Sequence, residues 1–188
     1  MLPPTPVPSA TGLTLLCVDL QPVFLKVIPD HERLSRRCLF AIQAAAGLDL
    51  PVIFTEQVPD KLGGTSPELL RGTSTAKIFP KATFSALADP EIRQALTGGS
   101  TEHVLLCGIE TSVCVHQTAL DALAGGWQVT ILSDCVGARR SDDAQVCLTA
   151  LIRAGAHVLP AETVFYSLLH DVRHPFFRAY TQLVKTHA

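Results

Sequence analysis

The sequence predicts an α/β fold built on a mostly parallel β-sheet, and three observations support this prediction. Short apolar runs typical of buried parallel strands alternate with helical stretches along the 188-residue chain. Glycine follows several of those helical stretches, as at Gly47 and Gly155. No repeat or domain linker interrupts the alternation. Because such strands and helices are joined by right-handed crossovers, we expect one domain with helices flanking the sheet.

The first half of the chain contains three expected strands. Residues 13–19 form an unbroken apolar run that ends at the carboxylate of Asp19, which is typical of a buried parallel strand. The stretch 32–46 carries apolar residues at helical spacing and ends before Gly47, so we expect a helix there. The rest of this half is expected to contain a strand at 51–55, a Gly- and Pro-rich loop at 56–67, a turn at 68–71, a strand at 77–79 and a helix at 90–97.

The second half continues the alternation. Residues 103–107 are apolar and are expected to form the fourth strand, and the helix after it is expected at 114–124. The later elements are expected as a strand at 127–132, a helix at 141–153, a sixth strand at 156–159 and helical segments up to the C-terminus. We expect residues 13–188 to form a single domain, preceded by a flexible tail at 1–12 without the basic region of a signal peptide.

Composition argues against several classes of function. The 15 basic and 17 acidic residues nearly cancel, whereas nucleic-acid binding usually requires a basic face, so nucleic acid is an unlikely partner. No apolar run approaches the ~18 residues that span a bilayer, so no membrane partner is expected. The six cysteines are widely spaced and form no CxxC pair, which favours free thiols in a reducing compartment. We therefore predict a cytoplasmic protein, with a mitochondrial location as the alternative.

Cys114 is the residue that points most directly to chemistry. It follows the fourth strand and starts a helix, where the helix dipole is expected to lower its pKa and favour the thiolate, as a nucleophile or a metal ligand. In parallel sheets, ligands bind beyond the carboxyl ends of the strands, where the strand order reverses. An order of 3-2-1-4-5 makes the first and fourth strands neighbours, so we expect Asp19 to lie close to Cys114.

Two further residues are candidates for a reactive site around this thiol. Asp19 is either an ordinary turn former at a strand end or a base that takes the thiol proton and returns it to a leaving amine. Lys81 is either a solvated side chain or a cation that stabilises the thiolate and the carboxylate. From the residues alone, Lys77, four positions earlier, is a competing candidate for that cation.

Motifs around these residues resemble those of a known family. They are Asp19-Leu20-Gln21 with Phe24, Lys81-Ala82-Thr83-Phe84-Ser85, and Gly108-Ile109-Glu110-Thr111-Ser112-Val113-Cys114-Val115. In this order, and spanning most of the chain, they resemble the isochorismatase-like cysteine hydrolase superfamily. A further stretch, Thr55-Glu56-Gln57-Val58-Pro59 with Leu62-Gly63, is similar to the subgroup of isochorismatase domain-containing proteins.

The resemblance implies a fold and a catalytic set. The fold is a three-layer αβα, Rossmann-like architecture with a six-stranded, mostly parallel sheet. The catalytic set is the triad Asp19, Lys81 and Cys114. The resemblance favours Lys81 over Lys77, because the family lysine stands three residues before an aromatic residue, as Lys81 stands before Phe84.

The resemblance also implies details of the site. A cis peptide bond is expected between Ile109 and Glu110, and the backbone N–H groups of Glu110 and Cys114 are expected to bind the oxyanion. The residues expected to line the substrate pocket are Gln21, Phe24, Gln57 and Phe84.

Departures from the family pattern narrow the chemistry. Nicotinamidases of this family bind a metal through an Asp-x-His element, but the matching stretch here is Glu56-Gln57-Val58, and valine cannot ligate a metal. We therefore expect no metal, no other cofactor and a substrate other than nicotinamide. Isochorismatases proper lack the cysteine nucleophile, so Cys114 argues against hydrolysis of a vinyl ether.

The sequence thus predicts a metal-independent cysteine hydrolase that acts on a small amide or related C–N bond through a thioester. Two rival classes remain: a non-catalytic binding or scaffold protein that keeps the fold and the triad, and a nucleic-acid-processing protein. Fast alkylation of Cys114 by iodoacetamide is expected to separate the enzyme from the scaffold.

A homo-oligomer is the other partner that the resemblance suggests. Apolar residues of the C-terminal segment could form the subunit interface or pack in the core; they are Phe165, Leu168, Leu169, Phe176 and Phe177.

Overall fold

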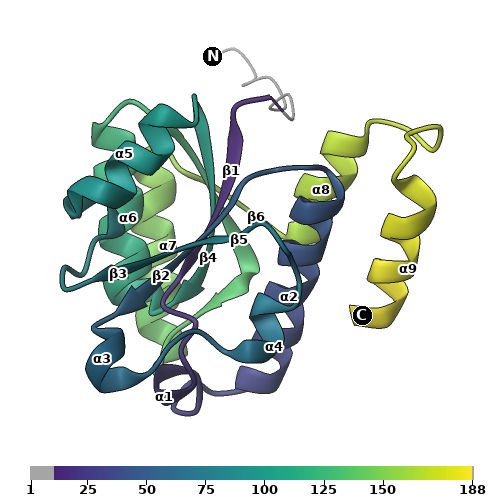
Figure 1. Cartoon of the computed structure of the whole chain (residues 1–188). Coiled ribbons are helices and arrows are strands. Elements are labelled where there is room, and N and C mark those ends of the chain that lie inside the picture. The colour runs from purple at the N-terminus through teal and green to yellow at the C-terminus, as the bar shows by residue number, and fades with distance from the viewer. Residues whose placement is uncertain (1–10, 188) are drawn as a thin grey trace.

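A computed structural model describes residues 11–187 and shows a parallel sheet between two layers of helices (Figure 1). The strands in this part of the chain form one six-stranded sheet in the order β3-β2-β1-β4-β5-β6, with every neighbouring pair parallel. They are β1 (Leu13–Val18), β2 (Val52–Gln57), β3 (Lys77–Lys81), β4 (His103–Ile109), β5 (Gln128–Gly137) and β6 (His157–Leu159). The predicted fold class is confirmed.

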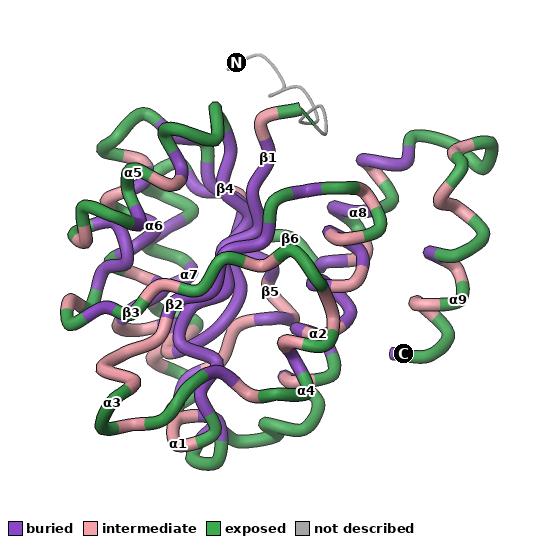
Figure 2. Tube along the Cα trace, viewed as in Figure 1, coloured by how far each residue is buried: buried purple, intermediate pink, exposed green. Residues whose placement is uncertain are grey.

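The helices divide between the two faces of the sheet. One face is covered by α2 (His31–Gly47) and α8 (Ala161–Leu169), with α9 (Phe177–His187) packed against α2, and the other by α5 (Pro90–Gly98), α6 (His116–Ala124) and α7 (Ser141–Arg153). The central strands β1 and β4 are buried along their whole length (Figure 2). Each face has its own cluster of buried apolar side chains, so the sheet separates two cores. No helix within residues 11–187 is long and apolar enough to cross a membrane.

The structure corrects several predicted boundaries at the carboxyl ends of the strands. β2, β3 and β4 each run two residues further than predicted, and β5 continues from Leu132 to Gly137. The extension of β5 begins with two polar residues, Ser133 and Asp134, and follows a register shift against β4 between Leu106 and Gly108, so the apolar run alone did not reveal it. Two single-turn helices were missed, α1 (Pro22–Leu25) and α3 (Pro59–Leu62), and the predicted turn at 68–71 is a third one, α4 (Pro67–Leu70). All three start at a proline, which suits the first helical turn.

The two ends of the chain are described only in part. Most of the predicted tail, residues 1–10, lies outside the described residues, as does residue 188. Gly12, the last residue of that tail, is held by the domain, because its carbonyl accepts hydrogen bonds from the backbone N–H groups of Glu102 and His103.

The apolar C-terminal segment belongs to the core of the single chain. Phe165, Leu168 and Leu169 are buried, and Phe176 and Phe177 are partly buried and packed against the same cluster as α2. Phe165, Leu168 and Leu169 therefore pack in the core of the chain, and the two partly buried phenylalanines extend the same cluster.

Gly108 allows β1 and β4 to approach each other at the carboxyl edge of the sheet. It pairs with Val18 and has a φ of +115°, and a Cβ atom built on it would lie 2.1 Å from the carbonyl oxygen of Val18. That contact involves rigid backbone, which no rotamer change can relieve. The residues that follow the two strands, Asp19 and the loop before Cys114, depend on this close pairing.

We predict that Gly108→Ala destabilises the fold by about 3 kcal/mol or more, because the added methyl group meets the backbone of β1. Gly155→Ala is the matched control: Gly155 has a φ of +107°, but a Cβ there would meet nothing within 4 Å. We expect the control to cost about 1–2 kcal/mol, from the backbone conformation alone. Urea unfolding followed by circular dichroism measures both values. Equal losses of unfolding free energy in the two variants would show that β1 and β4 can move apart enough to accommodate the added methyl group.

Candidate active site

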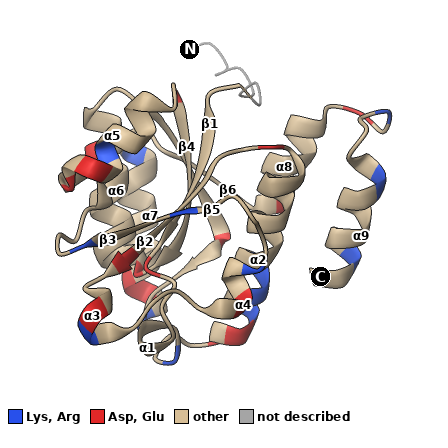
Figure 3. Ribbon diagram, viewed as in Figure 1, with Lys and Arg blue, Asp and Glu red and all other residues tan. Residues whose placement is uncertain are grey.

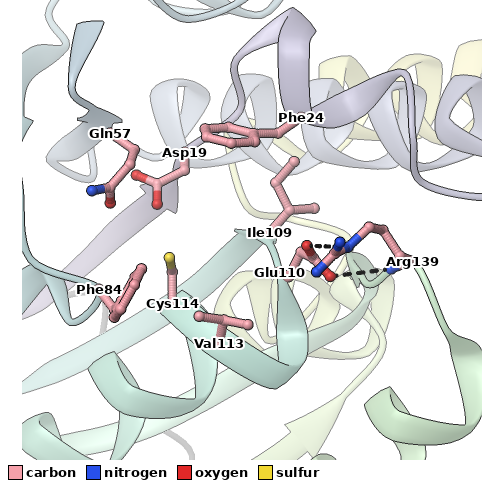
Figure 4. Close-up of a pocket in the computed structure, with 9 residues that line it drawn as sticks. All are labelled: Asp19, Phe24, Gln57, Phe84, Ile109, Glu110, Val113, Cys114 and Arg139. Atoms are coloured by element: carbon pink, nitrogen blue, oxygen red, sulfur yellow. Dashed lines mark hydrogen bonds and ion pairs between the residues drawn. The ribbon is translucent and has the colours of Figure 1, made fainter. Parts of the chain in front are cut away.

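Three side chains predicted to react converge at the carboxyl edge of the sheet. Asp19 follows β1, Lys81 is the last residue of β3, and Cys114 lies after β4. Lys81 Nζ is 2.8 Å from Asp19 Oδ2 and 3.9 Å from Cys114 Sγ. Figure 4 shows the sulfur of Cys114 facing the carboxylate of Asp19. Residues that are far apart in the sequence therefore form one contact group.

Lys81 is buried, with 3% of its surface exposed, and its ammonium is surrounded by acceptors. It reaches across the end of β2, where Gln57 Oε1 accepts a hydrogen bond from it at 2.6 Å. The carbonyl oxygens of Thr83 and Phe84 accept further bonds, at 2.9 and 3.4 Å. A buried ammonium requires such partners, because its desolvation is otherwise costly. Lys77, the competing candidate, is exposed at the start of β3.

Asp19 is fixed by the neighbouring strand as well as by Lys81. Its backbone has a φ of 51°, and Thr55 Oγ1 donates a 2.7 Å hydrogen bond to its Oδ1. Burial raises the pKa of Asp19, and the charge of Lys81 and the hydrogen bonds from Lys81 and Thr55 oppose that rise. Thr55 was not predicted as part of the site. Its position at the end of the strand next to β1 was the signal that could have identified it.

Cys114 is not at the start of an α-helix, contrary to the prediction. It lies inside a π-helical turn, Thr111–Val115, and α6 begins only at His116. The expected lowering of its pKa is also wrong. Burial and the negative charge of Asp19 raise the pKa of the thiol to about 12, although Lys81 and a backbone hydrogen bond from Glu110 act in the opposite direction. Burial and Asp19 therefore favour the protonated form of the thiol.

The loop before Cys114 has the predicted backbone geometry. The peptide bond between Ile109 and Glu110 is cis. The carbonyl oxygen of Glu110 accepts hydrogen bonds from the backbone N–H groups of Val113 and Val115, at 3.0 and 3.1 Å. The backbone of Glu110 also hydrogen-bonds the sulfur of Cys114, which places its N–H beside the nucleophile. Binding of an oxyanion by the N–H groups of Glu110 and Cys114 remains a prediction.

A cavity of about 330 Å³ opens onto the Cys114 sulfur, and this volume suits a small molecule. Three of the four predicted pocket residues line it: Phe24, Gln57 and Phe84. Its complete lining is Asp19, Phe24, Gln57, Phe84, Ile109, Glu110, Val113, Cys114 and Arg139 (Figure 4).

Gln21, the fourth predicted pocket residue, has a different role. Its side chain is fully buried and does not line the cavity. Its Oε1 accepts a 2.7 Å hydrogen bond from the backbone N–H of Gln57, and its Nε2 donates to the carbonyl oxygens of Gln57 and Gly63. Gln21 therefore links the segment after β1 to the end of β2 by hydrogen bonds and fixes the position of Gln57 in the site.

Arg139 and Val113 line the cavity and were not predicted. Val113 belongs to the π-helical turn, and Arg139 follows β5. Arg139 forms an ion pair with Glu110, with 2.8 Å between Nε and Oε1. A signal for Arg139 existed in the sequence, because the loop after β5 lies at the same edge of a parallel sheet as Cys114.

No metal cluster accompanies the thiol in the described part of the chain: residues 11–187 contain no group of three or more His, Cys, Asp or Glu side chains that could hold a metal ion. Val58 occupies the place at which the family pattern has a histidine, and it follows Gln57 at the end of β2. Metal-independent chemistry remains a prediction of the sequence.

Comparison with known proteins gives consistent matches over nearly the whole chain. The model of the isochorismatase domain family matches residues 14–163. Isochorismatase domain-containing protein 2 of Xenopus laevis is 35% identical over 175 residues, which are 93% of this chain and 83% of that protein. The secreted isochorismatase effector Isc1 of Phytophthora sojae is 36% identical over 178 residues, covering 92% of this chain and 84% of that protein.

A solved structure gives the same result. The structure of the MAR1 ribonuclease from Caenorhabditis elegans superposes with a TM-score of 0.89 at 32% sequence identity. The match covers 95% of this chain and 92% of that one.

We predict that Asp19→Asn lowers the pKa of Cys114 below about 12, because it removes a negative charge that raises this pKa. Lys81 keeps its neutral acceptors in this variant, and each unit of decrease gives about tenfold more thiolate at a fixed pH. The pH dependence of iodoacetamide alkylation, with the label located by peptide mapping, measures the change. Asp134→Asn, which removes a carboxylate paired with Arg37 instead, is the control and should leave the rate unchanged. An unchanged pKa in Asp19→Asn would mean that burial alone sets the proton affinity of the thiol.

Proposed function

This chain belongs to the isochorismatase domain family of hydrolases, and we propose that it is a metal-independent cysteine hydrolase of a small amide or a related C–N substrate. One observation carries the proposal: a buried thiol, a carboxylate and an ammonium contact one another at the base of a cavity sized for a small molecule. This is the arrangement of a nucleophile with its base and a counter-charge.

In the first half of the reaction, Cys114 Sγ attacks the carbonyl carbon of the amide while its proton moves to Asp19. The carbonyl oxygen becomes an oxyanion, which the N–H groups of Glu110 and Cys114 stabilise. The C–N bond then breaks, and the departing nitrogen takes the proton from Asp19. An amine leaves, and the acyl group remains on Cys114 as a thioester.

In the second half, water attacks the thioester carbonyl while Asp19 takes a proton from it. The C–S bond breaks, and the sulfur recovers a proton from Asp19. The net reaction converts one amide and one water into one acid and one amine, and the enzyme returns to its starting state. No metal or redox partner enters this balance.

The raised pKa of Cys114 fits proton transfer that accompanies attack. A free thiolate would be a minor species at neutral pH, because burial and Asp19 disfavour it. Lys81 opposes both effects, since its charge favours the anionic forms of Asp19 and Cys114. Removal of the thiol proton during attack avoids a separate, costly ionisation step.

The rival hypothesis is a scaffold protein that keeps the triad without catalysis. Slow alkylation of Cys114 by iodoacetamide would not distinguish this scaffold from an enzyme. With a pKa of about 12, the resting thiol reacts slowly with iodoacetamide whether or not the protein is an enzyme. Only turnover, or an acyl adduct on Cys114 after exposure to a panel of small amides, separates the two classes.

RNA cleavage is a second candidate, and the name of the similar Caenorhabditis elegans protein is what favours it. The charges of the described residues favour a small molecule instead, because Figure 3 shows Lys and Arg spread over several elements and interleaved with Asp and Glu. The net charge of −2 points the same way. Cleavage of RNA at low ionic strength that is lost in Cys114→Ala would establish this function. Self-association and the cellular compartment remain predictions.

We predict that Cys114→Ala lowers the turnover of an amide substrate by at least about 10³-fold, because no other cysteine lines this cavity to form the thioester. Turnover of a panel of small amides, followed by release of the amine, is the measurement. His116→Ala is the control, since His116 does not line the cavity. Full activity in Cys114→Ala would exclude the thioester mechanism, and a loss in His116→Ala would point to an imidazole base.

We predict that kcat/KM falls as the pH decreases through the pKa of Asp19, because the protonated carboxyl cannot accept the thiol proton. Burial raises this pKa above the ordinary value of 3.8, so the loss begins at a higher pH than an exposed aspartate would cause. Thr55→Val removes a hydrogen bond that lowers the pKa of Asp19, so it should shift the acid limb to higher pH. If the acid limb of kcat/KM stays at the same pH in Thr55→Val, a group other than Asp19 is the base.

A further inference from the structure

Helix α7 exposes one side to solvent, opposite the side that packs on the rest of the domain. Its packed side carries Leu148 and Leu151, which are both buried. Its other side, called here the outer face of α7, consists of exposed residues that repeat at helical spacing: Asp142, Val146, Thr149, Ala150 and Arg153. Val146, near the middle of this face, is 70% exposed.

The outer face of α7 contains a hollow of about 320 Å³, and every residue that lines it belongs to α7. Four of them, Val146, Thr149, Ala150 and Arg153, follow the spacing i, i+3, i+4 and i+7. This is the spacing of the holes that receive side chains from a facing helix in knobs-into-holes packing. The outer face therefore has the form of a helix-packing surface.

An apolar side chain can fill this hollow without leaving a polar group unpaired. Thr149 is the polar residue at its centre, and its Oγ1 donates a 2.8 Å hydrogen bond to the carbonyl oxygen of Gln145 in the same helix. The hydroxyl therefore keeps its partner when the hollow is covered. Ala150 has no side chain beyond Cβ, so a facing helix can approach closely at that point.

The two ends of the outer face of α7 carry opposite charges. Asp142 lies in the first turn of the helix and Arg153 in the last. Within residues 11–187 neither of them forms an ion pair, whereas the neighbouring Asp143 is paired with Arg140. The face therefore runs from a free carboxylate through an apolar centre to a free guanidinium.

A second copy of α7 in antiparallel orientation fits the hollow and the charges in one register. When Val146 of each copy enters the hollow of the other beside Thr149, the contact has two-fold symmetry. Asp142 lies four residues before Val146, and Arg153 lies four residues after Thr149. The same register therefore places Asp142 of each copy opposite Arg153 of the other. A parallel pair would oppose like charges, which is unfavourable.

We propose that the outer face of α7 is a homodimer interface, in which the α7 helices of two copies of this chain pack antiparallel around a two-fold axis. Val146 fills the hollow of the partner subunit, and an Asp142–Arg153 ion pair closes each end. This inference does not depend on the proposed hydrolysis. Two 13-residue helices bury less area than a standard interface, so we expect a reversible dimer with a Kd on the order of 10 µM.

Sedimentation velocity of the full chain in reducing buffer, at about 1–200 µM, tests the interface. We expect the wild type to change from monomer to dimer over this range. Val146→Asp places a carboxylate in each hollow and should raise the Kd at least about tenfold. Val172→Asp is the matched control, because Val172 is 69% exposed between α8 and α9, and its Kd should equal that of the wild type. Circular dichroism verifies that both variants are folded.

Exchange of the two charges tests the register. Asp142→Lys and Arg153→Glu, each alone, oppose like charges at both ends and should raise the Kd about threefold to tenfold. The double variant restores opposite charges and should regain most of the wild-type affinity. Both substitutions are unfavourable for the helix dipole, so this recovery cannot come from a more stable helix.

Each outcome supports or overturns the proposal. A wild-type chain that stays monomeric up to about 200 µM overturns it. An assembly that Val146→Asp leaves unchanged, or a loss of association that Val172→Asp shares, also overturns it, because the contact then lies elsewhere. Charge reversals that weaken association without recovery in the double variant overturn the antiparallel register. If the wild type forms a larger assembly, division of that assembly into smaller species by Val146→Asp supports the interface.

Discussion

The buried contact between the Lys81 ammonium and the Asp19 carboxylate is the constraint on which the site depends. The two atoms are 2.8 Å apart, and their side chains are at most 3% exposed. Removing one charge would leave the other desolvated, which typically costs 3–5 kcal/mol. The surrounding structure supports the pair accordingly: Thr55 and Gln57 from β2 bond to its two members, and Gln21 fixes the end of β2. The ends of three adjacent strands are held together at this point.

This pair also sets the state of the thiol. Asp19 disfavours the thiolate of Cys114 and Lys81 favours it, and burial shifts the balance toward the neutral thiol. A site built this way stores its nucleophile in protonated form beside its base. Cys114 then becomes reactive when a substrate carbonyl is bound beside it, because the proton leaves the sulfur during the attack. The same geometry gives the cavity two ends, with Asp19 on one side and the Glu110–Arg139 ion pair on the other (Figure 4).

The sequence predicted the fold and most of the site because both depend on local patterns. Apolar runs indicated most of the six strands, and the 3-2-1-4-5 order placed Asp19 beside Cys114, as the structure confirms. The motifs selected Lys81, which is buried, over Lys77, which is exposed. Strand ends were less predictable, since two polar residues interrupt the apolar run of β5 and its extension follows a register shift. Gln21 was misplaced because a motif does not reveal whether a side chain faces a cavity or the backbone behind it.

The sequence by itself determined the α/β class through its periodicity, and the rules of parallel sheets placed Asp19 beside Cys114. The choice of Lys81 as the third residue came from the family motifs in the sequence. Only the tertiary structure decided the proton affinity of Cys114, since a pKa depends on burial and on charges brought from other strands. It also decided that Cys114 lies within a π-helical turn and that Arg139 reaches the cavity. The pKa in particular arises from contacts between distant segments, which a local sequence pattern does not reveal.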